Sequence, residues 1–147
     1  MVSVKCLASG SAGNSYAVDD GKSVLLLEAG IRKRTILAGY MDLLMRVQGC
    51  LITHEHQDHA KAALGLPMAG IDVYASGGTF SALNAEKDRR NYRLHSIKAG
   101  EQFTLGTWTV LPWEAQHDAA EPLGFLLHSK ETRDKLIFAT DTYFIPN

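Results

Sequence analysis

The alternation of apolar and polar positions along this 147-residue chain predicts two kinds of regular segment. Short apolar runs bounded by glycine, serine or aspartate are typical of strands. Longer stretches with apolar residues at helical spacing are typical of amphipathic helices. We predict strands at 2–7, 15–18, 23–28, 50–53, 72–75, 102–105, 107–113, 123–128 and 135–139, and helices at 31–47, 60–66 and 79–84.

The order of these segments predicts the fold class. Strands and helices alternate early in the chain and strands dominate late, which indicates an α/β (α+β) protein with sheet layers and helices outside. The turn-forming residues 19–22 predict a hairpin between the two strands that they separate. We find no repeat, low-complexity tract or linker, so residues 1–147 are expected to form a single domain.

Composition and net charge place few limits on the function of this chain. Apolar residues make up 46% of the chain, enough for a packed core, and the net charge of −1 gives no overall basic field for nucleic acid. Segment 86–98 has an excess of three positive charges, and we interpret it as a solvated helix end and loop.

Cys6 and Cys50 lie in strand-like segments and are expected to be buried and unpaired. Without a signal peptide or a membrane-spanning run, we expect a cytoplasmic protein with no membrane contact.

The run T-H-E-H-Q-D-H at 53–59 is the densest cluster of candidate metal-ligand side chains in this sequence. It holds three imidazoles, with the carboxylate of Asp58 among them, between an apolar strand-like run and a helix-like one. In an extended loop His54 and His56 point to one side, whereas Asp58 and His59 turn toward a second position. Packing alone does not explain so many ionisable groups, because burying them unpaired costs stability. The run therefore predicts a metal site, and the arrangement suits two ions that share a bridge.

Other polar residues follow apolar strands and extend this site. Glu28, His117 and Asp141 each lie at or just after a predicted strand, so that strand ends form a common rim with the histidine run. His95 and His128 are isolated, and we interpret them as surface or hydrogen-bonded core residues.

These motifs resemble the metallo-β-lactamase superfamily. The histidine run matches its HxHxDH motif, His117 its third-histidine motif and Asp141 its bridging aspartate. The segments S-G-S-A-G-N-S at 9–15, H-D-A-A-E-P-L-G-F at 117–125 and A-T-D-T at 139–142 resemble the YycJ/WalJ-like subgroup, whose members are linked to DNA processing.

The resemblance implies the αβ/βα sandwich of the superfamily and two divalent metal ions, zinc foremost, with manganese or iron as alternatives. His54, His56 and His117 would hold one ion, Asp58 and His59 the second, and Asp141 would bridge them. Asp58 would also be catalytic, orienting the nucleophile and managing its proton. Glu28 stands where relatives carry an aspartate that braces the histidine loop.

The chain also departs from the superfamily pattern. Relatives continue beyond Asp141 with further strands and helices and another metal-binding histidine, whereas the last histidine here is His128. On this basis we interpret the chain as C-terminally truncated, expect weaker occupancy of the second metal site, and expect a homo-oligomer that covers apolar sheet surface.

Three functions remain open from the sequence. The leading hypothesis is a metal-dependent hydrolase that acts on a phosphodiester, with nucleic acid as substrate. The alternatives are a catalytically inactive relative that folds, oligomerises and holds one metal, and a thioester hydrolase.

Loop 9–15 is either a phosphate contact through its backbone amides or a tight connection between strands. Trp108 and Trp113 are expected in the core or at an interface.

Overall fold

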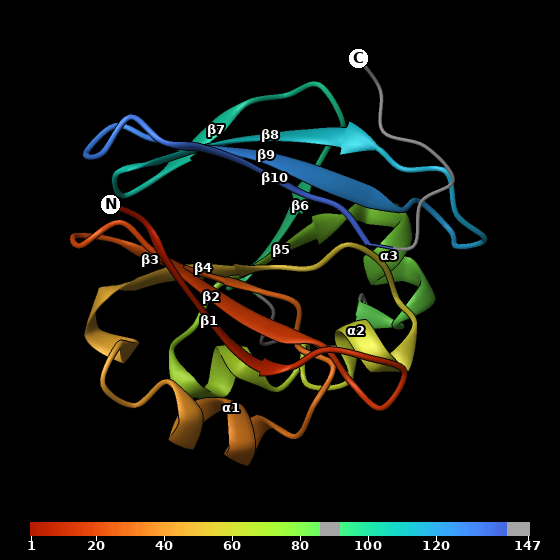
Figure 1. Ribbon diagram of the computed structural model, residues 1–147. Coiled ribbons are helices and arrows are strands. Elements are labelled where there is room, and N and C mark those ends of the chain that lie inside the picture. Colours follow the sequence, from red (N-terminus) through yellow and green to blue (C-terminus); the bar gives the residue numbers. More distant parts are fainter. Residues whose placement is uncertain (86–91, 141–147) are drawn as a thin grey trace.

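Two β-sheets stacked face to face form the body of the protein, with helices on the outer side of the first sheet (Figure 1). The computed structural model describes residues 1–85 and 92–140. Leu25, Leu27 and Phe125 belong to an apolar cluster between the two sheets. Leu26 belongs to a second cluster, which lies between the first sheet and the helices and includes Ile36. The predicted sandwich of sheets and helices is confirmed.

The first sheet has six strands in chain order. The first three strands pair antiparallel, and β3, β4, β5 and β6 then pair in parallel. Every residue of β3 is buried, as expected for a central strand that is covered on both faces. The strands are β1 (Ser3–Ala8), β2 (Ser15–Asp19), β3 (Val24–Leu27), β4 (Val47–Leu51), β5 (Val73–Ser76) and β6 (Leu94–Ile97).

The second sheet is antiparallel, with the order β10-β9-β8-β7. Its strands are β7 (Phe103–Leu105), β8 (Trp108–Glu114), β9 (Leu123–Ser129) and β10 (Lys135–Phe138). Trp108 of β8 is fully buried and donates from Nε1 to the carbonyl oxygen of Ser23 at 2.9 Å, so it lies in the core as predicted.

The helices are short. They are α1 (Lys33–Gly39), α2 (Gln57–Ala60) and α3 (Gly77–Ala82), with 3-10 turns η1 (Leu44–Arg46) and η2 (Leu66–Ala69). In the described residues no helix has the length and apolar character needed to cross a membrane. Strands β3 and β4 end at the same edge of the first sheet, because they run in parallel. The residues that follow them, Glu28 and the histidine run, therefore meet there.

Several predicted elements differ from the observed ones. The helix predicted at 31–47 ends at Gly39, and Val47 begins β4. Leu43 and Leu44 still pack against the core from a turn and from η1, so the apolar spacing is satisfied without a continuous α-helix. The helix predicted at 60–66 is replaced by α2 and a series of turns. Proline at position 67, which favours the first turn of a helix, starts η2 instead.

Two further expectations are wrong for identifiable reasons. Cys6 is exposed because β1 is an edge strand, whereas Cys50 is buried as predicted. Residues 94–97 of the basic segment form β6 rather than a loop. Residues 86–91 lie outside the described part. Nε2 of His95 lies 2.7 Å from Oδ2 of Asp72 and its side chain is partly exposed, in agreement with the prediction of a surface or hydrogen-bonded histidine.

Asp20 ties the two sheets together at the end opposite the histidine run. Its Oδ1 accepts from the amides of Lys22 and Ser23 at 2.9 and 2.8 Å. Its Oδ2 accepts from the hydroxyls of Thr107, in the turn between β7 and β8, and Ser129 of β9, so both donors come from the second sheet and its connections. Burial by itself would raise the pKa of this carboxyl, but these hydrogen bonds outweigh burial and hold the pKa below its ordinary value of 3.8.

We predict that Asp20→Asn lowers the free energy of unfolding by about 1–3 kcal/mol at neutral pH, because an amide nitrogen cannot accept both hydroxyl protons. The folded pKa is lowered, so this stabilisation is present above about pH 4 and is lost as pH falls through the folded pKa. Urea denaturation at several pH values measures the difference. The exposed Asp134→Asn is the control, and equal stability of the two variants at pH 7 would contradict the prediction.

Candidate metal centre

Three histidines from two parts of the chain converge at the edge where β4 ends. His54 and His56 lie in the loop between β4 and α2, and His117 lies in the loop after β8. One ligand atom from each lies within 4.8 Å of the others, and Nε2 of His117 is 3.3 Å from Nδ1 of His56. A tetrahedral zinc site with Zn–N distances near 2.0–2.1 Å spaces its nitrogens by about 3.3 Å. The donor set therefore fits one divalent metal ion.

Asp58 and His59 lie beside this triad. Nε2 of His59 is 3.4 Å from Oδ2 of Asp58, and the His59 ring centroid is 4.3 Å from that of His54. The His59 side chain is buried, whereas that of Asp58 is 33% exposed to solvent. The structure thus brings five of the six residues predicted as ligands to one place. The sixth, Asp141, lies outside the described residues.

A buried carboxylate orients these histidines from behind. Oε1 of Glu28 accepts from the amide of Thr53, and Oε2 accepts from the Thr53 hydroxyl, both at 2.8 Å. Oε2 of Glu28 also contacts Nδ1 of His59. This contact fixes the proton on Nδ1 of His59 and leaves Nε2 as the ligand atom facing Asp58.

Thr53 extends the same hydrogen-bonded chain to the triad. Its hydroxyl donates to Glu28, so its oxygen accepts from Nδ1 of His54 at 2.8 Å. Nε2 is then the ligand atom of His54. One carboxylate therefore sets the tautomers of two histidines, one in each predicted metal position.

The position of Glu28 is destabilised by burial of its carboxylate and by its backbone conformation. Burial raises its pKa above the ordinary value of 4.5, although hydrogen bonds with His59 and Thr53 oppose the shift. Its φ of 69° lies in the left-handed region, which costs about 1–3 kcal/mol for such a residue. Its amide donates to the carbonyl of Leu51 at 2.8 Å and holds the strained backbone in place.

The loop 9–14 between β1 and β2 supports the histidine loop on one side. Nδ2 of Asn14 donates to the carbonyl oxygen of Asp58 at 2.9 Å. Gly30 lies against the same carbonyl, and a Cβ at this position would be only 1.8 Å from that oxygen. A groove of about 440 Å³ beside Asp58 and His59 is lined by Ser9, Gly10, Ser11, Asn14, Tyr16, Asp58, His59 and Thr140.

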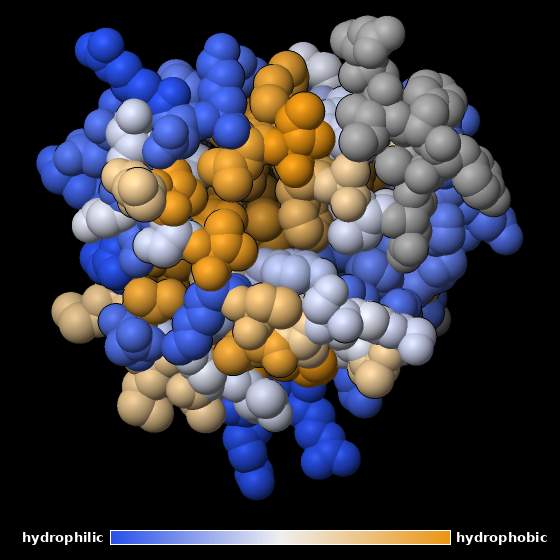
Figure 2. Space-filling model, viewed as in Figure 1, coloured by the Kyte–Doolittle hydropathy of each residue, from blue (hydrophilic) through white to orange (hydrophobic). Residues whose placement is uncertain are grey.

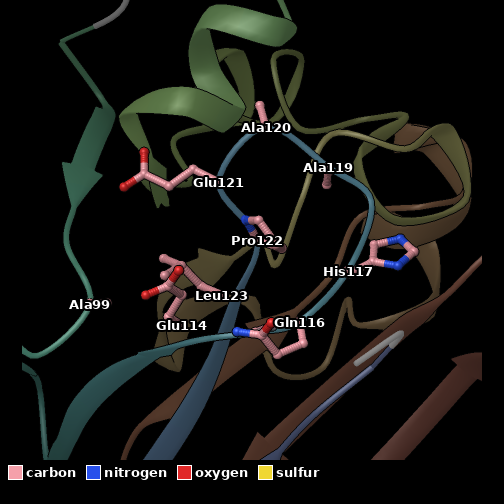
Figure 3. A pocket seen from close by; sticks show the side chains of 10 residues that line it. Ala99, Glu114, Gln116, His117, Ala119, Ala120, Glu121, Pro122 and Leu123 are labelled. Carbon is pink, nitrogen blue, oxygen red and sulfur yellow. The ribbon is translucent and has the colours of Figure 1, made fainter. Parts of the chain in front are cut away.

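A second groove, of about 400 Å³, lies along the loop that carries His117. In Figure 3, His117 and Glu121 lie on opposite sides of this loop. Oε1 of Glu121 accepts from the amide of Gly78 at 2.8 Å, and Oε2 of Glu55 accepts from that of Ala120 at 2.9 Å. These bonds anchor the loop to α3 and to the histidine run.

The sequence did not reveal these anchoring roles. Asn14, Glu55 and Glu121 bond to partners 43 to 65 residues away in the chain. For Glu55 a local signal existed, since it alternates with His54 and His56 and so points away from the triad. No local pattern marks Glu121.

The fold and the histidine cluster are those of a metallo-β-lactamase-fold protein. The metallo-beta-lactamase fold protein YhfI from Bacillus subtilis superposes with a TM-score of 0.72 at 14% identity. The match covers 92% of this chain and 60% of YhfI. At this identity the likeness shows the fold alone.

Residues 26–147 match the family model of the beta-lactamase superfamily domain. This chain belongs to the metallo-β-lactamase superfamily, which confirms the resemblance of its motifs. Exodeoxyribonuclease YycJ of Bacillus anthracis is 33% identical over 149 residues, and exodeoxyribonuclease WalJ of Streptococcus pneumoniae is 30% identical over 146. Each match covers 95% of this chain but only 54% of the relative, so the chain spans about half the length of these proteins.

We predict that Glu28→Gln lowers zinc affinity by about 10–100-fold, because an amide cannot accept from both Thr53 and His59 while keeping its own protons satisfied. Competition with a chromophoric chelator measures the affinity, and circular dichroism checks the fold. Glu114→Gln, at an exposed carboxylate, is the matched control. Zinc affinity that is the same in both folded variants would show that Glu28 does not orient the ligands.

Proposed function

We propose that this chain is a metal-dependent hydrolase that cleaves phosphodiester bonds in nucleic acid. The observation that carries the proposal is the triad of His54, His56 and His117, whose ligand atoms lie within 4.8 Å beside the pair Asp58 and His59. The relatives YycJ and WalJ are named exodeoxyribonucleases, which supports DNA as the substrate class.

The residues present divide into two ligand sets. His54, His56 and His117 would hold one ion, and Asp58 and His59 the second, with Asp141 as the proposed bridge. Zinc suits a donor set rich in imidazole, and manganese or iron are the alternatives. When bound, such ions polarise phosphate oxygens and bring the pKa of water from about 15.7 to near 7.

The chain's own residues complete the chemistry. Glu28 and Thr53 hold the imidazoles in the tautomers that binding requires. Asp58, partly exposed at the groove, orients the attacking water and receives its proton. The water oxygen forms a bond to phosphorus in line with the leaving oxygen, whose bond to phosphorus breaks.

We predict that His56→Ala lowers the rate of cleavage of bis(4-nitrophenyl) phosphate and of single-stranded DNA by at least about 100-fold. Losing a ligand removes several kcal/mol of charge stabilisation, and each 1.36 kcal/mol is tenfold in rate. Chelator is expected to abolish cleavage by the unaltered chain, and added divalent metal to restore it. His128→Ala, in β9 outside the centre, serves as the control and should cleave normally.

One result would contradict the proposal of hydrolase activity. An unaltered chain that cleaves neither substrate with zinc, manganese or iron would sink the hydrolase proposal. It would favour the inactive relative that binds metal without turnover.

We also propose that the chain self-associates through an apolar groove between β2 and β10. Figure 2 shows apolar side chains gathered between the two sheets. The groove, of about 240 Å³, is lined mainly by apolar residues of both sheets, and Ile137 beside it is 58% exposed. Strands β1 and β10 are the edges of their sheets in the described part of the chain. A second copy would bury this apolar surface.

Light scattering at micromolar concentration tests the self-association. We expect a dimer or larger species that Ile137→Lys shifts toward monomer, because the charge opposes burial of the groove. Lys135→Glu, an exposed charge change on the same strand, separates a charge effect from the loss of apolar contact. A monomer for the unaltered chain would refute the proposal.

A further inference from the structure

The groove beside Asp58 and His59 has a polar lining of an unusual kind. Ser9, Ser11 and Tyr16 each contribute a hydroxyl, and among the described residues the acidic or basic side chains that line the groove are those of the candidate ligands Asp58 and His59. The hydroxyl of Tyr16 donates to Oγ of Ser9 at 3.0 Å, so the Ser9 hydroxyl keeps its own proton for another acceptor. The lining is therefore rich in neutral donors directly beside the metal centre.

Ser11 also has donor capacity to spare. Across residues 1–85 and 92–140, neither its amide nor its hydroxyl donates to another protein group, and the residue is exposed. The neighbouring side chain of Asn14 and the amides of Gly10 and Gly13 are already paired. Oδ1 of Asn14 accepts from the amide of Gly10 at 3.2 Å, and Gly13 donates to the carbonyl of Gly10 at the same distance.

The backbone of this loop is held at a fixed place relative to the centre. Nδ2 of Asn14 donates both to Gly10 and to Asp58, at 3.0 and 2.9 Å. A Cβ on Gly13 would lie 2.5 Å from the carbonyl oxygen of Gly30, so glycine is needed for this close approach. The donors of Ser11 are thereby positioned against the same residue, Asp58, that borders the reacting groups. In Figure 1 this loop, between β1 and β2, lies next to α2.

The two grooves that border the centre differ in charge. The groove along the His117 loop is lined by the carboxylates of Glu114 and Glu121, which repel a phosphate. The groove at loop 9–14 offers hydroxyl and amide donors, and its one described carboxylate, Asp58, is a candidate metal ligand. A polyanionic strand that reaches the metal centre is therefore favoured on the side of loop 9–14.

We propose that loop 9–14 binds the phosphate that adjoins the scissile phosphate in a nucleic-acid strand, with the hydroxyl and amide of Ser11 as its donors. This inference rests on the proposed nuclease function and adds the direction in which the strand leaves the centre. No described lysine or arginine lines this groove, and the charge of a metal ion held at the centre would favour the phosphate instead.

Binding measurements on the zinc-loaded chain test the inference. Fluorescence anisotropy at low temperature reports the affinity for a labelled thymidine decamer, and competition reports that for thymidine monophosphate, which has a single phosphate. We expect Ser11→Asp to weaken decamer binding at least about tenfold by like-charge repulsion. Ser11→Ala should weaken it about threefold to tenfold through one lost hydrogen bond. Both changes should be smaller for the monophosphate.

Controls separate the possible causes. Ser81→Asp, an exposed serine on α3 that lines neither groove, should leave decamer affinity unchanged. Zinc affinity should be equal in all variants, which shows that an aspartate at position 11 does not act as a metal ligand.

The outcomes are distinguishable. Decamer affinity that is unchanged in Ser11→Asp, or weakened equally for decamer and monophosphate, would overturn the adjoining-phosphate site and leave the nuclease proposal standing. Failure of the unaltered, zinc-loaded chain to bind the decamer at all would overturn both.

Discussion

The buried carboxylate of Glu28 is the interaction on which the candidate centre depends. It follows β3 and bonds to the backbone and side chain of Thr53 after β4, and to His59 in α2. Three segments are thus joined through one group. A carboxylate is buried here in spite of its desolvation cost because hydrogen-bond donors surround it and because the neighbouring imidazoles need a fixed tautomer.

The centre also depends on the packing of the two sheets. His54 and His56 belong to the first sheet's connections and His117 to the second's, so the triad closes only when the sheets are correctly spaced. Large apolar side chains such as Trp108 fill the space between the sheets. Asp20 fixes the opposite end through bonds to both. Residues far from the metal position therefore set the distances within it.

Much of this architecture could be predicted from local patterns. The hairpin, the strand before the histidines and the clustering of His54 with His56 and Asp58 follow from apolar runs, turn residues and spacing. The length of α1 could not, because Leu43 and Leu44 satisfy an apolar periodicity from a turn and the 3-10 helix η1. The exposure of Cys6 depends on which strand forms the edge. The roles of Asn14 and Glu121 depend on contacts between distant segments, which no local pattern encodes.

The metal content of the purified chain tests the candidate centre most directly. Protein prepared without chelator, loaded with zinc and desalted would be measured by elemental mass spectrometry, beside a variant in which His54 and His117 are both alanine. The geometry of the triad predicts at least about one zinc ion per unaltered chain and a large loss in the double variant. Little or no zinc in the unaltered chain, or equal zinc in both proteins, would contradict a metal centre built on these histidines.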